Sequence, residues 1–576
     1  MVDDLKWLIF PHLLVLEENG QPCGEQTDLK NLAVTCRGFL EVALDVLWRQ
    51  ARFDRLMQVW KARGVVDERY VGDDSWRTIY PPLRTMEFAT TPTIEDWQRF
   101  EYYARRIRRM QLEYLPASTN FWSAFASAVL NRAIHPTVQI EESPIPPIFP
   151  KIKSLECDLR EDNFDACVRV INESPSLDSF ALFADPGHVL ELPSEPWVAV
   201  FSSLGNHGRP LKNLAIRPRM YGTEARDAMD AKTDSLAQLI RQSELEEVIL
   251  PGDAIRVEII ASAMSYIPTL KLLEVWNHWN GPDEPDAVPI PHDAFPSLEC
   301  LRGDIIAVAS LLVIPTFPSL AKLMIQGEVG GAWMAWPFVR EMIGTIAQSC
   351  PALEVLHLSV NLCFRETNDS ESARRTTTSG FSTLQGCPRL KDVLLDFPKT
   401  LSPNARSIED GINLSDAQWE QLAEAWPDLT SVRLCMGRCE DDREFEPICP
   451  RPRATLRTIS SFLRHCPKLF SFGVPILARG EEARTALEGV SPTQGPTRLD
   501  FRGSWIDKED TQDVALFIAS QSPHQETEIR IPQPEEPYEP RLHVGGQTIE
   551  VAQYEGWQEI KHLVESARTK TQARRL

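Results

Sequence analysis

The sequence of 576 residues contains no long hydrophobic run. Its longest, residues 305–314, is far short of the roughly 20 residues that a helix needs to cross a bilayer. Near its start, Asp3, Asp4 and Lys6 surround a brief apolar stretch that lacks the basic beginning and small-residue cleavage site of a signal peptide. We therefore expect no membrane partner and a location in the cytosol, the nucleus or both.

Basic residues and clustered cysteines are also scarce. The 60 Lys and Arg residues are outnumbered by 82 Asp and Glu residues, which gives a net charge of −22 at pH 7. Nucleic-acid binding needs a surplus of cations, so we expect no general nucleic-acid partner, although a local basic patch remains compatible. The 12 cysteines lack the dense pattern of a disulfide framework, which favours a reducing compartment.

Catalytic motifs are absent as well. The glycines at 327, 330 and 331 lack the Lys-Ser/Thr of a P-loop and the spacing of a dinucleotide-binding loop. No nucleophile-elbow sequence is present. The candidate zinc ligands fit none of the common paired spacings: Cys435, Cys439, Cys449, His465 and Cys466. We therefore predict no enzyme activity, no metal and no cofactor.

One phrase recurs along the chain: Pro-x-Leu-x-x-apolar-x-apolar. Its last two apolar positions alternate with polar ones, which is typical of a half-buried strand, and Pro ends a preceding helix. Copies begin at Pro175, Pro210 (one residue shorter), Pro268, Pro318, Pro351, Pro388, Pro427 and Pro467, with partial copies at Leu245 and Pro296. Further fits cover residues 82–88 and 107–112, and degenerate copies surround Leu499 and Ile529.

Helical patterns lie between many of these phrases, at residues 162–173, 225–242, 337–350, 415–426, 454–466 and 508–521. A single strand–loop–helix–turn unit cannot bury its own apolar side, so the units must stack. The phrase resembles the L-x-x-L-x-L pattern of the leucine-rich repeat family over most of residues 80–530. The resemblance implies an α/β solenoid, a curved parallel sheet with helices on the convex side.

The repeat spacing is irregular, from 22 residues between Pro296 and Pro318 to 40 between Pro427 and Pro467. The usual period is about 20–29 residues, so the long units carry insertions. A doubly wound α/β domain with chance similarity is the alternative. Cys350, Cys387 and Cys466 each precede a repeat proline and are better explained as small buried residues than as metal ligands.

A dense amphipathic stretch, residues 28–53, precedes the repeats. Its apolar residues recur at helical steps of three and four, and Gly38 is expected to divide it into two helices. So small a segment cannot cover its own apolar face, so it needs a partner surface in this chain or in another protein.

The run LAVTCRGF followed by ALDVLWR resembles the second half of an F-box, in the style of fungal F-box proteins. Residues 9–13 are similar to the IF-x-x-L of its first helix, although the usual preceding Leu-Pro and Glu are absent and residues 17–27 form a polar insert. The resemblance implies docking onto the adaptor subunit of a cullin-RING ubiquitin ligase. The implied adaptor-binding residues are Ile9, Phe10, Leu13, Leu29, Leu32, Cys36, Leu47 and Trp48. The alternative is a helical pair that merely caps the next domain.

The predicted organisation has four parts. Residues 1–55 form the F-box-like helical module, 56–79 a helical linker, and 80–530 the leucine-rich-repeat solenoid with irregular insertions. Residues 531–576 are expected to contain a Pro-rich segment, a hairpin at 543–551 and a capping helix at 555–569.

Within the implied solenoid, the polar positions that alternate with buried strand residues point to the concave sheet face. They are Arg217, Glu274, Trp276, Lys322, Gln326, His357, Asp392, Asp396 and Arg433. This mixed polar and aromatic set suits a protein target or a small ligand. We therefore predict a substrate-recognition subunit of an SCF/cullin-RING ubiquitin ligase. The alternative is a leucine-rich-repeat interaction scaffold without a ubiquitin-ligase role.

Overall fold

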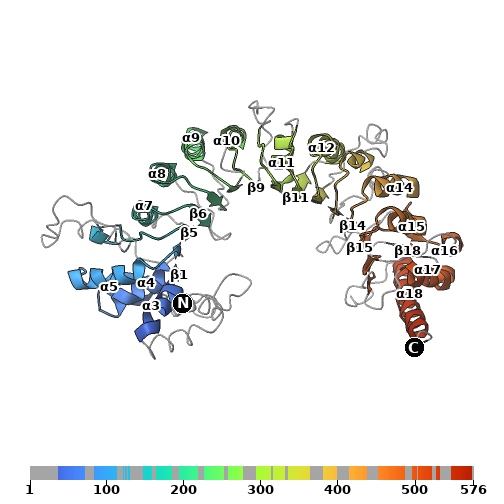
Figure 1. Ribbon diagram of the computed structural model, residues 1–576, viewed down its shortest axis with the longest axis horizontal. Coiled ribbons are helices and arrows are strands. Elements are labelled where there is room, and N and C mark those ends of the chain that lie inside the picture. The colour runs from blue at the N-terminus through green and yellow to red at the C-terminus, as the bar shows by residue number, and fades with distance from the viewer. Residues whose placement is uncertain are drawn as a thin grey trace. The chain divides into compact units, whose positions relative to one another are not determined.

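The computed structural model forms two compact units, each with helices on one face of a row of strands (Figure 1). The N-terminal unit comprises residues 1–270 and 279–289, and the C-terminal unit comprises 271–278 and 290–576. The structure describes residues 37–71, 83–112, 121, 124–125, 127–129, 147–158, 164–183, 194–217, 226–251, 257–276, 294–312, 316–330, 335–363, 381–397, 414–436, 452–486, 496–501, 504–506, 508–521, 527–531 and 547–573.

Among the described residues of the N-terminal unit, six strands lie in the order β1-β4-β5-β6-β7-β8, each parallel to its neighbours. They are β1 (Gln50–Arg52), β4 (Arg109–Leu112), β5 (Ser154–Asp158), β6 (Ser179–Phe183), β7 (Asn213–Ile216) and β8 (Glu247–Pro251). The helices are α3 (Arg37–Leu47), α4 (Phe53–Lys61), α5 (Ile94–Ala104), α7 (Phe164–Asn172), α8 (Ser194–Gly205), α9 (Arg226–Gln242) and α10 (Val257–Met264). Helices α7 to α10 line the same face of this sheet (Figure 1).

The C-terminal unit continues the pattern with nine described strands in the order β9-β10-β11-β12-β13-β14-β15-β17-β19. They are β9 (Leu272–Trp276), β10 (Cys300–Asp304), β11 (Lys322–Gly330), β12 (Val355–Cys363), β13 (Asp392–Phe397), β14 (Ser431–Met436), β15 (Ser471–Gly473), β17 (Arg498–Asp500) and β19 (Glu528–Arg530). The helices are α11 (Ile305–Leu312), α12 (Ala335–Ser349), η5 (Phe381–Gly386), α14 (Asp416–Ala425), α15 (Leu456–His465), α16 (Gly480–Ala486), η6 (Lys508–Asp510), α17 (Thr511–Gln521) and α18 (Gln547–Ala573). A short parallel pair, β16 (Leu477–Ala478) and β18 (Trp505–Ile506), lies outside the main sheet.

The parallel strand pairing confirms the predicted α/β solenoid of stacked repeats. Every full copy of the recurrent phrase leads into a strand of the sheet, and the six predicted helices overlap α7, α9, α12, α14, α15 and α17. The phrase leucines Leu177, Leu320 and Leu353 are fully buried. Buried and half-buried residues alternate along β6 and β13, because one face of each strand packs on the core beneath the helices.

Two N-terminal expectations were wrong. Strand β1, which lies inside the stretch predicted as helical, pairs in parallel with β4, so the described sheet already includes residues 50–52, before the predicted start of the repeats at residue 80. The phrase at residues 83–88 forms β3 (Leu83–Phe88), which pairs antiparallel with β2 (Val66–Val71) in a separate sheet. Gly38 is the second residue of α3, and the residues before α3 lie outside the described part of the chain, so the predicted division of the run at Gly38 stays a prediction. An alternating pattern predicts a half-buried strand but not the direction of its partner.

The C-terminal end is a helix where a hairpin was predicted. Residues 547–551 belong to α18, so the hairpin at 543–551 was wrong, whereas the helix predicted at 555–569 is confirmed within α18. The buried Trp557 stacks on Phe501 with ring centroids 4.6 Å apart, and its Nε1 donates to the Ser504 carbonyl at 3.1 Å. These contacts hold α18 against the C-terminal unit. Gly545 and Gly546, where the hairpin turn was predicted, lie outside the described residues.

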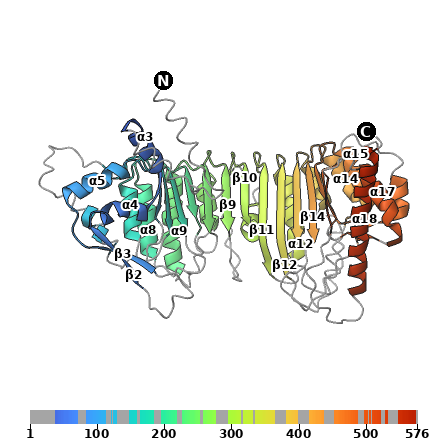
Figure 2. The ribbon, with the colours of Figure 1, turned by 90° about the horizontal axis from the view of Figure 1, so that it is seen from below.

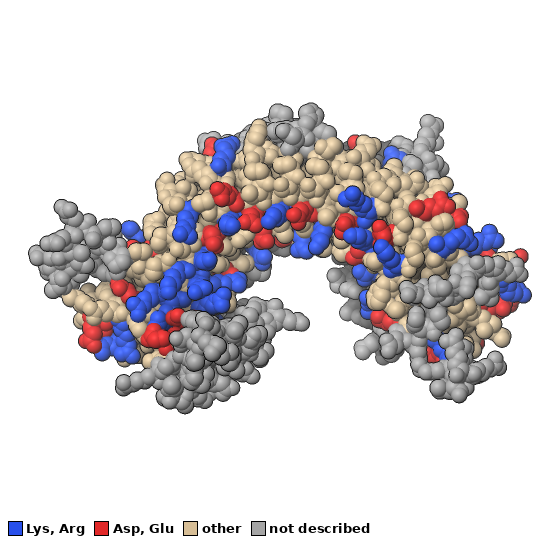
Figure 3. All heavy atoms as spheres, viewed as in Figure 1, with Lys and Arg blue, Asp and Glu red and all other residues tan. Residues whose placement is uncertain are grey.

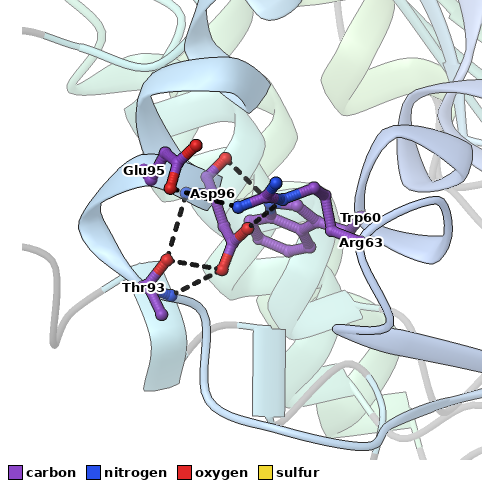
Figure 4. A network of polar contacts seen from close by, with 5 residues as sticks. All are labelled: Trp60, Arg63, Thr93, Glu95 and Asp96. Atoms are coloured by element: carbon purple, nitrogen blue, oxygen red, sulfur yellow. Dashed lines mark hydrogen bonds and ion pairs between the residues drawn. The ribbon is translucent and has the colours of Figure 1, made fainter.

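Helices α4 and α5 are joined by a polar and aromatic network (Figure 4). Trp60 donates its Nε1 hydrogen to the Asp96 carbonyl at 3.3 Å, and Arg63 Nε donates to Asp96 Oδ1 at 3.0 Å. Thr93 and Asp96 form a capping box at the start of α5, which satisfies free backbone N–H groups. Burial acts to raise the pKa of Asp96, but the bonds from Thr93 and Arg63 outweigh it and hold the pKa below its usual value.

Strand β10 runs directly into α11, with Asp304 at the junction. Its carboxylate accepts a bond from Ile306 N at 2.9 Å, which caps the first turn of α11. Burial raises the pKa of Asp304 to about 6, because the ionised carboxylate has lost much of its water. A Cβ at Gly327 on the neighbouring strand β11 would lie 2.3 Å from Asp304 Oδ2. A side chain at position 327 would therefore overlap the Asp304 carboxyl group, and glycine avoids this overlap.

We expect Asp304→Asn to stabilise the protein at neutral pH. The folded state holds a proton up to about pH 6, whereas the unfolded chain releases it near pH 3.9. Wild-type stability therefore falls as pH rises through this window and stays lower above it. Asn keeps an accepting oxygen without the charge, so the variant should gain about 1–2 kcal/mol near pH 7.5, after allowance for solvent screening. Urea unfolding at several pH values measures the difference, and a gain that does not shrink towards pH 4 would contradict the assignment.

Within the described part of the chain, no helix combines the length and the apolar character needed to span a bilayer.

Candidate functional site

Helix α3 carries two apolar faces that differ in exposure. Ala43 and Val46 are buried against the rest of the N-terminal unit. Leu40, Leu44 and Leu47 are only half-buried, and their steps of four and three place them in one stripe along the helix. We call these three residues the α3 stripe. It is the described part of the amphipathic stretch that retains apolar surface for a partner.

The predicted adaptor-binding residues fall into two groups. Leu47 lies in the α3 stripe, and Trp48 follows α3 directly, half-buried, with its ring centroid 4.8 Å from that of Tyr103. The others lie outside the described residues: Ile9, Phe10, Leu13, Leu29, Leu32 and Cys36. Leu40 and Leu44, which share the stripe, were part of the helical pattern but were not named as contacts.

Charged side chains attach α3 to α5. The buried guanidinium of Arg106 pairs with Glu41 and lies 3.2 Å from Asp45 Oδ1. Tyr102 Oη donates to Glu41 Oε1 at 2.6 Å, and this bond, with the nearby Arg106, lowers the pKa of Glu41. Helix α3 is therefore held to its own unit through the carboxylates of Glu41 and Asp45, while the side chains of the α3 stripe stay partly exposed to solvent.

The second candidate site is the sheet face of the C-terminal unit that carries no helices. Figure 2 shows strands β10, β11 and β12 side by side, with β14 further along the same sheet. The register brings predicted target-binding residues into three rows across these strands. Glu274, His357 and Arg433 share one row, Lys322 and Asp392 share a second, and Gln326 and Asp396 share a third with Ser359.

Several residues of this face contact one another. His357 Nε2 lies 3.0 Å from Asp392 Oδ2, and Ser359 Oγ donates to Asp396 Oδ2 at 3.3 Å. Burial acts to raise the pKa of Asp392, but bonds from His357 and Ser431 outweigh it, so its pKa is lowered. These contacts hold the side chains in place before any partner binds, which reduces the entropy lost on binding.

The remaining predicted residues are less closely connected. Trp276 Nε1 donates to Glu274 Oε1 at 2.6 Å, while Lys322 and Gln326 are exposed. Arg217 belongs to the N-terminal unit, where its guanidinium lies 5.2 Å from the Phe183 ring centroid. The nine residues therefore do not form a single described site.

Sequence reasoning missed two members of the C-terminal face. Arg302 and Met324 pair in register between Glu274 and His357, and Arg302 Nε lies 3.0 Å from Met324 Sδ. Both residues alternate with buried neighbours along their strands, and this pattern predicts that they face outward. Met324 was overlooked because an apolar residue at an outward position resembles core.

One group of possible metal ligands occurs among the described residues. Glu420, Glu424 and His465 bring their ligand atoms within 4.8 Å of one another on α14 and α15. The Arg464 guanidinium lies 3.5 Å from Glu420 Oε1, where it competes with a cation. All three groups are partly or fully exposed, so they do not make a convincing site.

The repeat cysteines are buried, as predicted. Cys350, Cys387 and Cys466 are at most 1% exposed. Burial raises the pKa of Cys387 and Cys466 to about 12 and that of Cys350 further, so these thiols stay protonated. Of the other candidate zinc ligands, Cys435 is half-buried on β14, while Cys439 and Cys449 lie outside the described residues.

Comparison with known proteins adds little to this picture. No protein-family model and no curated protein sequence matches the chain. Among solved structures, the chain is similar to one from the crystal structure of the Rad7 and Elc1 complex in yeast, at 12% identity. That match covers 57% of this chain and 76% of the other, with a TM-score of 0.26. So distant a likeness carries no argument, and the two candidate sites depend on the contacts described above.

Proposed function

We propose that this chain is the F-box-type substrate-recognition subunit of an SCF/cullin-RING ubiquitin ligase in the cytosol or nucleus. The N-terminal helices bind the adaptor, the sheet face binds a protein target, and other subunits perform the transfer chemistry. The receptor is not itself an enzyme and acts by raising the local concentration of the target near the transfer site.

The α3 stripe is the observation that carries this proposal. Helix α3 covers the ALDVL part of the F-box-like sequence, and Leu40, Leu44 and Leu47 remain half-exposed on it. Burying a leucine side chain contributes roughly 1.5–3 kcal/mol, so an apolar partner helix would gain from covering the stripe. Arg106 pairs with Glu41 and Asp45 of α3, which fixes the helix and so presents the stripe as a docking surface.

A double variant tests the adaptor contact. Replacing Leu44 and Leu47 by Asp introduces two charges into the proposed interface, so capture of the purified adaptor should weaken by at least about 100-fold. Leu516→Asp is the matched control, because Leu516 is an exposed leucine on α17 of the other unit. Pull-down and circular dichroism report binding and folding, respectively. Capture that survives in the folded double variant would refute the docking face.

An interaction scaffold without a ubiquitin-ligase role is the second candidate. The ion pairs of Arg106 with Glu41 and Asp45 favour it, because they tie α3 to its own unit, as a capping helix requires. Under this alternative, neither the wild type nor any α3 variant captures the adaptor. The wild-type pull-down therefore separates the two candidates.

A further inference from the structure

A row of basic side chains lies at the start of the first three strands of the N-terminal sheet. Arg49, Arg108 and Lys153 immediately precede β1, β4 and β5, and all three are exposed. Backbone bonds join them, from Arg108 N to the Arg49 carbonyl at 2.9 Å and from Lys153 N to the Arg108 carbonyl at 2.7 Å. Neighbouring strands lie about 4.8 Å apart, so the three cations line up over about 10 Å. We call them the basic row.

The same position in the next three repeats is occupied differently. It holds Asp178, Lys212 and Glu246, so the charges alternate, and Lys212 Nζ lies 3.0 Å from Glu246 Oε1. In the described part of the chain, by contrast, the basic row makes no side-chain ion pair or hydrogen bond. Figure 3 shows Lys and Arg side chains gathered over β1 and β5.

Three neighbouring cations whose side chains form no ion pair in the described structure repel one another, and a bound anion relieves that repulsion. The sheet face beside the row shows the contact that such an anion would make. Arg109, the first residue of β4, donates from Nε to Glu156 Oε1 at 2.7 Å. A guanidinium presents a planar fork of donors that matches a carboxylate, so Arg49 and Arg108 are suited to the same kind of partner.

We propose that the basic row binds an acidic segment of a protein target, with consecutive Asp and Glu side chains. This inference rests on the proposed receptor function and names the class of target that the receptor selects. The row covers only three strands and ends where Asp178 begins the alternating charges, so it fits a short segment. A nucleic-acid strand would need a longer basic groove with aromatic stacking platforms, and the net charge of −22 opposes a long polyanion.

The experiment measures fluorescence anisotropy of a labelled Asp/Glu peptide with the full chain. The wild type should bind this peptide, bind the matched Asn/Gln peptide far more weakly, and lose affinity as salt is raised. The triple variant Arg49→Gln, Arg108→Gln, Lys153→Gln should bind at least about tenfold more weakly. Lys212→Gln is the matched control, because Lys212 has the same position in the ladder but is paired with Glu246, and its affinity should stay within about twofold.

Each outcome decides the inference. Equal affinity of the wild type and the triple variant, or an equal loss in Lys212→Gln, would overturn it. Tighter binding of an oligothymidylate than of the acidic peptide would also overturn it in favour of a nucleic-acid surface. Adaptor capture is measured on the same triple variant. If capture persists while peptide binding is absent in the wild type, only the target class fails and the receptor function stands.

Discussion

Gly303→Ala is expected to destabilise the C-terminal unit by at least about 3 kcal/mol or to prevent its folding. Gly303 lies on β10 opposite Val275 of β9, with φ of 157°. A Cβ built there would lie 1.9 Å from the Val275 carbonyl oxygen and 2.9 Å from its carbon. Both are backbone atoms of a paired strand, so no side-chain rotation relieves the overlap. The two strands would have to separate at the point where their register is set.

Gly344→Ala provides the matched control for this experiment. Gly344 lies within α12, and nothing lies within 4 Å of the Cβ that alanine would add. Because alanine favours helix over glycine, this variant should be neutral or more stable by about 0.5–1 kcal/mol. Urea unfolding followed by circular dichroism compares the two variants. Similar stability changes in both would show that the close approach at Gly303 does not matter.

Trp60→Ala is expected to cost the N-terminal unit about 3–5 kcal/mol, the usual range for emptying a buried aromatic site. Trp60 is fully buried, stacks on Phe100 with centroids 4.4 Å apart, and meets Trp97 edge-on at 4.9 Å. Its indole also donates to the Asp96 carbonyl, so the substitution leaves that oxygen without its partner. The loss therefore combines a cavity with a broken link between α4 and α5.

Trp60→Phe separates these two contributions. Phenylalanine retains most of the ring packing but lacks the N–H donor, so we expect a loss of about 1–3 kcal/mol, clearly less than that of Trp60→Ala. Chemical denaturation monitored by near-UV circular dichroism measures both variants. Equal losses would indicate that packing around Trp60 contributes little and that the hydrogen bond dominates.

Local patterns in the sequence predicted most of the repeated strands and six of the helices between them, but not α8, α10, α11 or α16. The phrase around Pro351 combines a helix-ending proline with an alternating apolar pair, and both features depend on nearby residues alone. The direction of pairing depends on distant partners instead. For this reason β3 was assigned to the repeats although it pairs antiparallel with β2, and β1 was hidden inside an amphipathic pattern.

The candidate sites divide in the same way. Alternation identified His357 and Asp392 as outward-facing residues, but not their contact, because 35 residues including an insertion separate them. The basic row was missed because its members precede the alternating part of each strand. A comparison of the residues immediately before successive strands would have shown Arg49, Arg108 and Lys153 at equivalent positions.

The buried thiols of Cys350, Cys387 and Cys466 have a practical consequence for studying this chain. Their raised pKa values keep the nucleophilic thiolate scarce, and their burial excludes an alkylating reagent. Each cysteine directly precedes the proline of a different repeat, so its modification requires that repeat to open. The rate at which each of these three native cysteines is alkylated therefore reports the local unfolding of its own repeat, without any engineered label.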